Sequence, residues 1–253
     1  QITQQSALSF SHADVLIVAG GICFLSLYMA PNRFQTLFFR SSSITYFYPA
    51  VFNVWISNIY MRYLKTGKPI NLYALAITAL VGSGFSEVGV VIQLSMWALI
   101  YIFSMATGKG KRTNRAARVI TIFSFAGLLG MLLCPNNAER QANFGDANTI
   151  GALITDGPLL GVDFIFYAVR GNVIPIVAAL MVGVYAGVKS KNPFRKTSDM
   201  VTFMAGMVLI GYGLIVIGIL PSLYVYSAYP DGRGFTEAVF FLTTVMCMFG
   251  LCI

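Results

Sequence analysis

The chain has 253 residues, of which 57% are hydrophobic and 10% are charged, and its mean hydropathy is +0.74. Because its apolar segments are continuous rather than alternating, the composition predicts an all-α integral membrane protein and excludes a soluble enzyme. The net charge of +8 would suggest nucleic acid in a soluble protein. In a membrane protein it instead indicates which loops face the cytoplasm, so we expect no nucleic-acid partner.

Eight apolar stretches are expected to cross the membrane as one polytopic domain covering residues 1–253. They are residues 14–30, 44–64, 70–82, 88–106, 119–134, 172–188, 200–220 and 236–253. The third, about 13 residues long, would span only some 20 Å as a helix. It is therefore either a half-crossing or continues through residues 83–86 in irregular backbone that other helices shield. The first residues show no signal peptide and the last lie inside an apolar stretch, so we expect the chain to be a fragment.

Basic residues divide unequally between the two expected sides of the membrane. One side has twelve of the 17, including every lysine: Arg62, Lys65, Lys68, Lys109, Lys111, Arg112, Arg115, Arg118, Lys189, Lys191, Arg195 and Lys196. The positive-inside rule assigns this side to the cytoplasm. The outer side has five arginines, Arg33, Arg40, Arg140, Arg170 and Arg233, and seven of the nine acids, Glu87, Glu139, Asp146, Asp156, Asp163, Asp231 and Glu237. Arginine binds phosphate or carboxylate through a planar fork, so any chemistry is expected on the outer face, although topology alone also depletes lysine there.

Glu87 is the candidate catalytic residue. It follows Gly82-Ser-Gly-Phe-Ser and lies near the turn between two expected crossings. A charged group at membrane depth is costly and commonly faces a wet cavity or a partner. The alternative is that Glu87 only caps the next helix, since a carboxylate is favourable at a helix N-terminus.

Three outer loops offer candidate substrate-binding residues. The longest covers residues 135–171, and its segment 153–167 is expected to lie on the membrane surface. Its candidates are Asn137, Glu139, Arg140 and Arg170. Glu139 and Arg140 could instead form an exposed ion pair worth about 0–1 kcal/mol.

The other two outer loops add Arg40 and Tyr46, and Asp231 and Arg233. Aromatic faces with carboxylates suit sugars, and arginine suits a polyprenyl phosphate; interfacial tyrosines are also common membrane anchors. No motif in the sequence identifies a cofactor, so the cofactor is unknown. The four cysteines show no metal-binding spacing and His12 has no clustered partner, so no metal site is expected.

The segments Ser43-Ile-Thr-Tyr-Phe-Tyr-Pro49, Gly82-Ser-Gly-Phe-Ser-Glu87 and Pro135-Asn-Asn-Ala-Glu-Arg140 occur in this order. Together they resemble a group of bacterial polytopic membrane proteins related to glucosyltransferases that modify surface polysaccharides of the cell envelope. Asn136 stands where that group has glycine. The positions that carry over are Glu87, Asn137 and Arg140.

The resemblance implies a multi-pass glycosyltransferase-like protein of the bacterial inner membrane that takes sugar from a polyprenyl-phosphate donor on the outer face. Such enzymes use an acid in the first outer loop as general base. Residues 31–43 contain no acid. Either an N-terminal part carrying that acid precedes this chain, or Glu87 has the role, or the chain does not catalyse transfer.

Two alternatives remain, so whether the chain is an enzyme stays open. One is a non-catalytic helical subunit with membrane-protein partners, in which Gly183 and Gly187 pack against neighbouring helices. The other is a transporter or flippase, in which the short third segment and Glu87 form a broken-helix site. A cavity shared by Glu87 and the outer arginines would favour the transferase over the subunit.

Overall fold

The computed structural model describes residues 11–40, 43–108, 110–135, 148–190, 194, 196–226 and 232–253. The helices are α1 (His12–Met29), α2 (Arg33–Leu37), α4 (Tyr48–Thr66), α5 (Pro69–Ser83), α6 (Glu87–Ala106), α7 (Lys111–Leu132), α9 (Ile150–Gly171), α10 (Val173–Ser190), α11 (Thr197–Tyr226) and α12 (Thr236–Leu251). A π-helical turn, η1 (Ser43–Phe47), precedes α4, and a 3-10 turn, η2 (Gly232–Phe235), precedes α12. No strand occurs in these ranges, so the described structure is all-α.

Six of these helices are long and apolar enough to cross a membrane by length and composition: α1, α6, α7, α9, α10 and α11. Two further apolar helices, α5 and α12, are shorter, with 15 and 16 residues. Large apolar side chains on the helix surfaces are exposed, among them Phe24, Ile77, Ile102 and Leu209. Several apolar helices with exposed apolar faces suggest a multi-pass membrane protein.

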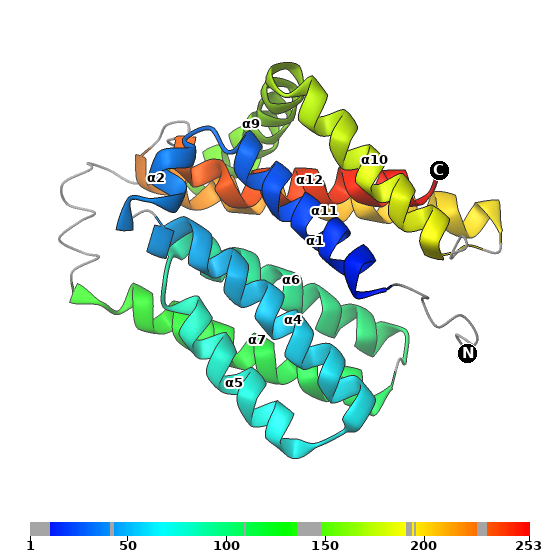
Figure 1. Cartoon of the computed structure of the whole chain (residues 1–253). Helices are drawn as coiled ribbons and strands as arrows, with labels where there is room; N and C mark the ends of the chain where they lie inside the picture. The colour runs from blue at the N-terminus through cyan, green and yellow to red at the C-terminus, as the bar shows by residue number, and fades with distance from the viewer. Residues whose placement is uncertain are drawn as a thin grey trace.

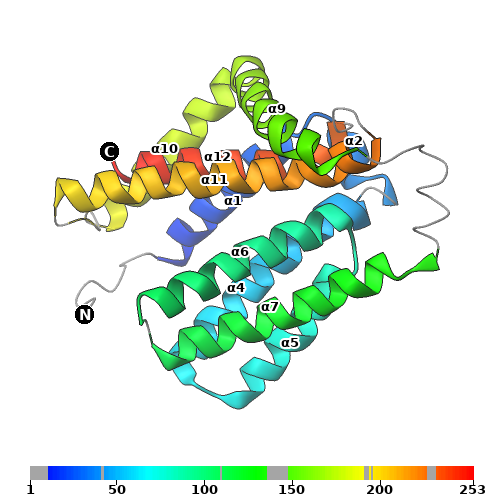
Figure 2. The ribbon, with the colours of Figure 1, turned by 180° about the vertical axis from the view of Figure 1, so that it is seen from behind.

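The helices form two groups (Figures 1 and 2). One contains α4, α5, α6 and α7; the other contains α1, α10, α11 and α12, with α9 packed on α11. Both views place the C-terminal ends of α4, α6 and α10 at one end, which we call the basic end, and α2 and η2 at the other, which we call the far end. At the basic end, Arg112 Nη1 donates to the Leu64 carbonyl at 3.2 Å, which ties the start of α7 to the end of α4.

Buried side chains hold the first group together through a core that contains Ile56, Tyr63, Leu75, Ala79, Trp97, Ala116 and Ile120. One polar side chain also crosses this core. Gln93 Nε2 donates to the Ala79 carbonyl at 2.9 Å and to Ser124 Oγ at 2.7 Å, so α6 is hydrogen-bonded to both α5 and α7. A buried amide with partners costs little and fixes the register of the helices.

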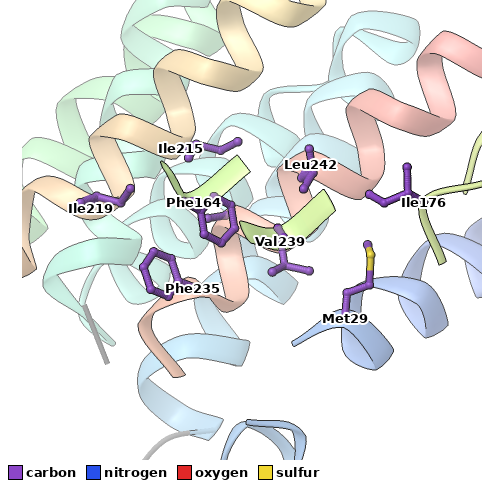
Figure 3. Packing of buried hydrophobic residues seen from close by; sticks show 10 residues of the cluster. Met29, Phe164, Ile176, Ile215, Ile219, Phe235, Val239 and Leu242 are labelled. Carbon is purple, nitrogen blue, oxygen red and sulfur yellow. The ribbon is translucent and has the colours of Figure 1, made fainter. Parts of the chain in front are cut away.

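The second group has its own apolar core, shown in Figure 3. Phe164 of α9 stacks on Phe235 with 4.7 Å between ring centroids, and Val239 and Leu242 of α12 continue the cluster. Val88 and Ile92 of α6 pack on Leu214 of α11 and so join the two groups.

Glycine allows α10 and α12 to approach closely. A Cβ added at Gly183 would overlap the Cys247 carbonyl, and one added at Gly250 would overlap the Leu180 carbonyl. Gly183 and Gly187, which were expected to pack against neighbouring helices, therefore pack against α12 of the same chain.

At the basic end, α1 is fixed to α10 by Asp14. Its carboxylate accepts hydrogen bonds from Ser11 Oγ at 2.8 Å and from the Tyr185 hydroxyl, and lies 3.4 Å from Lys189 Nζ. Ser11 also caps α1, because its Oγ accepts from the Asp14 backbone N–H.

Two segments that were expected to lie outside the crossing stretches are helical. The basic residues Lys111 to Arg118, expected in a loop, form the first turns of α7, because Ala116 and Ala117 are buried against the group. The segment expected on the membrane surface, residues 153–167, lies within the 22-residue helix α9, which is also long and apolar enough to cross a membrane.

Candidate functional site

Glu87 is the first residue of α6, and its side chain is half-buried. Ser86 caps the helix, since its Oγ accepts from the Gly89 backbone N–H at 2.9 Å. Phe85 before the cap packs against Phe52 with 5.0 Å between ring centroids. The carboxylate therefore lies in the first helical turn, where the helix dipole favours a negative charge, so the capping role and the catalytic role both remain predictions.

The predicted substrate-binding residues are only partly described. Arg40 is exposed, Tyr46 is half-buried in η1, and Arg170 is exposed in the last turn of α9. The backbone of Arg233 belongs to η2. Asn137, Glu139, Arg140 and Asp231 lie outside the described residues.

Arg170 lines a cavity of about 540 Å³ together with Arg33. The Arg33 guanidinium lies 4.2 Å from the centroid of the Tyr28 ring. Apolar wall residues of this arginine cavity include Phe24, Leu25, Val173, Ile174 and Pro175. The site thus combines two cations with a largely hydrocarbon wall.

A second cavity, of about 160 Å³, lies between α4, α6 and α12. Its lining includes Asn53, Ser57 and Glu237. Asn53 Oδ1 and both carboxylate oxygens of Glu237 are buried without a hydrogen-bond partner. Glu237 is only 4% exposed. We call this the acceptor cavity.

An apolar cavity of about 280 Å³ adjoins the acceptor cavity. The two share the lining residues Ala50, Val54 and Phe240, and the apolar cavity extends to Cys23, Ser26 and Leu27 of α1. Together they run from α1 along the boundary between the two helix groups to Glu237.

Sequence analysis placed Glu237 only among the acids of the outer side and did not propose it as a site residue. The available signal was an acid directly at the start of the apolar stretch 236–253. Asn53 and Arg33 were likewise not singled out as site residues, because their partners lie far away in the sequence.

Glu87 lines neither the arginine cavity nor the acceptor cavity. Over the described residues, the structure does not bring the candidate base and the outer arginines into one of these cavities. No group of three or more His, Cys, Asp or Glu that could hold a metal ion occurs in this part of the chain.

Over the described residues, the protein is all-helical, with several apolar helices and two separate polar cavities. No protein-family model, curated protein or solved structure matches the chain.

Proposed function

We propose that the chain is an eight-span protein of the bacterial inner membrane that binds a phosphorylated lipid at its outer face. The spans are α1, α4, α5, α6, α7, α10, α11 and α12. The basic end then faces the cytoplasm, because loops rich in lysine and arginine stay on that side. The short helices α5 and α12 would cross by local thinning of the bilayer, which costs a fraction of a kcal/mol per ångström of mismatch.

The position of α9 supports this count. The Asn148 backbone N–H donates to the Tyr224 carbonyl at 3.0 Å, so the segment that leads into α9 lies beside the end of α11. At the other end of α9, Arg170 shares a cavity with Tyr28 and Arg33, close to the end of α1. A helix that begins and ends near the far end does not cross, so α9 would lie obliquely in the outer leaflet.

The arginine cavity is the observation that supports lipid binding. Two guanidinium groups can hold the oxygens of one phosphate through charge-assisted hydrogen bonds. The apolar wall would hold the first part of the hydrocarbon chain. A polyprenyl phosphate combines both features.

Transfer of a sugar from such a lipid is a second proposal, which rests on Glu87 and not on the arginine cavity. Glu87 would take the proton of the acceptor hydroxyl, whose oxygen attacks the anomeric carbon while the bond to phosphate breaks and the polyprenyl phosphate leaves. Because Glu87 does not line the arginine cavity, lipid binding and transfer are separate proposals.

Lipid binding is tested with purified protein by native mass spectrometry, using polyprenyl phosphate and the uncharged polyprenol. Arg33→Gln and Arg170→Gln should each lower phosphate-lipid affinity about tenfold to a hundredfold, since hydrogen bonds to charged groups are worth about 1.5–3 kcal/mol. The control is Arg62→Gln, which removes an exposed arginine near the basic end of α4 that does not line this cavity. Equal affinity for the two lipids, or an equal loss in all three variants, would rule out a phosphate site here.

Transfer is tested separately with a polyprenyl-phosphate-linked sugar. If Glu87→Gln transfers sugar at the parental rate while the arginine variants lose lipid, the chain binds the lipid without using Glu87 as base.

A further inference from the structure

The acceptor cavity presents unpaired acceptors toward one space. Asn53 Oδ1 and the two carboxylate oxygens of Glu237 have no hydrogen-bond partner. Ser57 Oγ donates to the backbone carbonyl of Asn53 at 2.8 Å, so its proton is used and only its lone pairs remain. The three unpaired atoms are all acceptors, so a ligand that satisfies them must donate hydrogen bonds.

The charge of the cavity favours a cation. A buried carboxylate without a partner is expensive, and an opposite charge repays much of that cost. None of the described residues that line the cavity is basic. Glu237 lies in the first turn of α12, where the helix dipole offsets only part of the cost of burying an ionised carboxylate. A cation supplied by a ligand would complete the site.

The shape of the cavity favours an organic cation over a bare metal ion. A volume of about 160 Å³ exceeds what one ion fills, and Met96, Phe240 and Phe241 give it an apolar and aromatic wall. An ammonium group has three donors and no acceptor, which matches the three unpaired acceptor atoms. Aromatic faces also attract ammonium groups. The adjoining apolar cavity can take a hydrocarbon chain.

We propose that the acceptor cavity binds a primary ammonium group carried on a hydrocarbon chain, with Glu237 and Asn53 as its acceptors. The ligand can be a free alkylamine or the amino headgroup of a lipid. This site is independent of the arginine cavity, because the two lie against different faces of α1: Leu25 and Tyr28 line one, and Ser26 and Leu27 line the apolar extension of the other.

The first experiment uses the purified full chain in detergent with n-hexylamine as the cationic probe and n-hexanol as the neutral probe of similar size. Calorimetric titration should show tighter binding of hexylamine. Glu237→Gln should lower hexylamine affinity at least about tenfold and leave hexanol affinity unchanged, because only the amine loses its counter-charge. The matched control is Asp199→Asn, which removes an exposed acid from the first turn of α11 and should change neither affinity.

A second pair of variants keeps the test valid if Glu237→Gln does not fold. Asn53→Leu removes one acceptor and should lower hexylamine affinity by about threefold to tenfold. Asn53→Asp adds a negative charge and should raise it. Arg33→Gln should leave amine affinity unchanged, which separates failure of this site from failure of the arginine site.

The source of the amine is resolved in nanodiscs made of phosphatidylethanolamine or phosphatidylcholine. If hexylamine binding is weakened only in phosphatidylethanolamine, the amino headgroup occupies the site; if binding is equal in both, the ligand is a free amine. Equal affinity for hexylamine and hexanol, or hexylamine binding that no Glu237 or Asn53 variant changes, overturns the proposal. The proposal is also overturned if Glu237→Gln stabilises the protein and the parent protein binds no amine. The buried carboxyl group would then be a site that is stabilised simply by losing its charge.

Discussion

Replacing Gly183 by alanine should separate the two most closely packed helices of the second group. The added Cβ would overlap the Cys247 carbonyl, with the Cys247 carbonyl carbon at 2.8 Å and Gly250 Cα at 2.9 Å. All three atoms belong to helical backbone, which cannot rotate away as a flexible side chain would. We therefore expect α10 and α12 to move apart, and the contact between Gly187 and Leu251 to loosen with them.

Two opposing terms set the magnitude. Alanine is favoured over glycine in a helix interior by about 0.5–1 kcal/mol. Overpacking typically costs about 1–3 kcal/mol, and a clash with backbone belongs at the upper end of this range. The net loss for Gly183→Ala is then about 2 kcal/mol. The midpoint of thermal unfolding should fall by roughly 4–8 °C, at about 2–4 °C per kcal/mol for a chain of this size.

The assay is thermal unfolding of purified protein in one detergent, with Gly206→Ala and Gly213→Ala as controls. Both control glycines lie in α11, and an added Cβ meets no atom within 4 Å at either. The controls should unfold at the parental temperature or slightly above it. If Gly183→Ala unfolds together with the controls, the close approach of α10 and α12 is wrong.

Two further predictions concern the ends of the bundle. Tyr185→Phe removes a hydrogen bond to the Asp14 carboxylate and should lower the free energy of unfolding more than Lys189→Met does, because the lost bond joins a hydroxyl to a charged acceptor. Lys189→Met should lower the free energy of unfolding by no more than about 1 kcal/mol, since the Lys189 side chain is 45% exposed. Equal losses for the two variants in chemical unfolding would contradict this ranking. In a background where Cys134 is the sole native cysteine, an impermeant thiol reagent should label Cys134 from outside the cell and a Lys68→Cys substitution only after the membrane is opened. Labelling of both from the same side would contradict the proposed topology, and labelling in the opposite order would reverse the orientation.

Apolar runs predicted most of the helices but not where each begins. The stretch at residues 119–134 was placed too late, because hydropathy excludes the basic residues that open α7. The helix continues there since Ala117 faces inward while Arg112 reaches the end of α4. A hydropathy value averaged over a window does not show that a helix has one buried and one basic side. Ala116 and Ala117, which lie between the basic residues, were nevertheless visible in the sequence.

The helix α9 was harder to assign from sequence. Asp156 and Asp163 interrupt its apolar residues, which favoured a surface segment over a crossing. Both side chains are exposed in the structure, while Gly157 and Gly161 let the helix approach α11. Whether such a helix crosses depends on where its two ends are held, and this is a tertiary property.

The candidate sites depended even more on tertiary structure. Glu87 was found because its carboxylate interrupts a long apolar run, a local signal. Glu237 has the same local signal at the start of α12, but its importance comes from Asn53, which lies on α4 in the other helix group. Nothing in the spacing of residues along the chain predicts that α4 and α12 face each other.

The sign of charge in the two cavities restricts what each can bind. Arg33 and Arg170 would repel an ammonium group and attract phosphate, whereas Glu237 would do the reverse. A zwitterionic headgroup would therefore meet one attractive and one repulsive partner in either cavity if it entered whole. Selectivity should follow the part of the ligand that enters first, so an anionic lipid without an amine should compete for the arginine cavity alone. An amine without a phosphate should compete for the acceptor cavity alone.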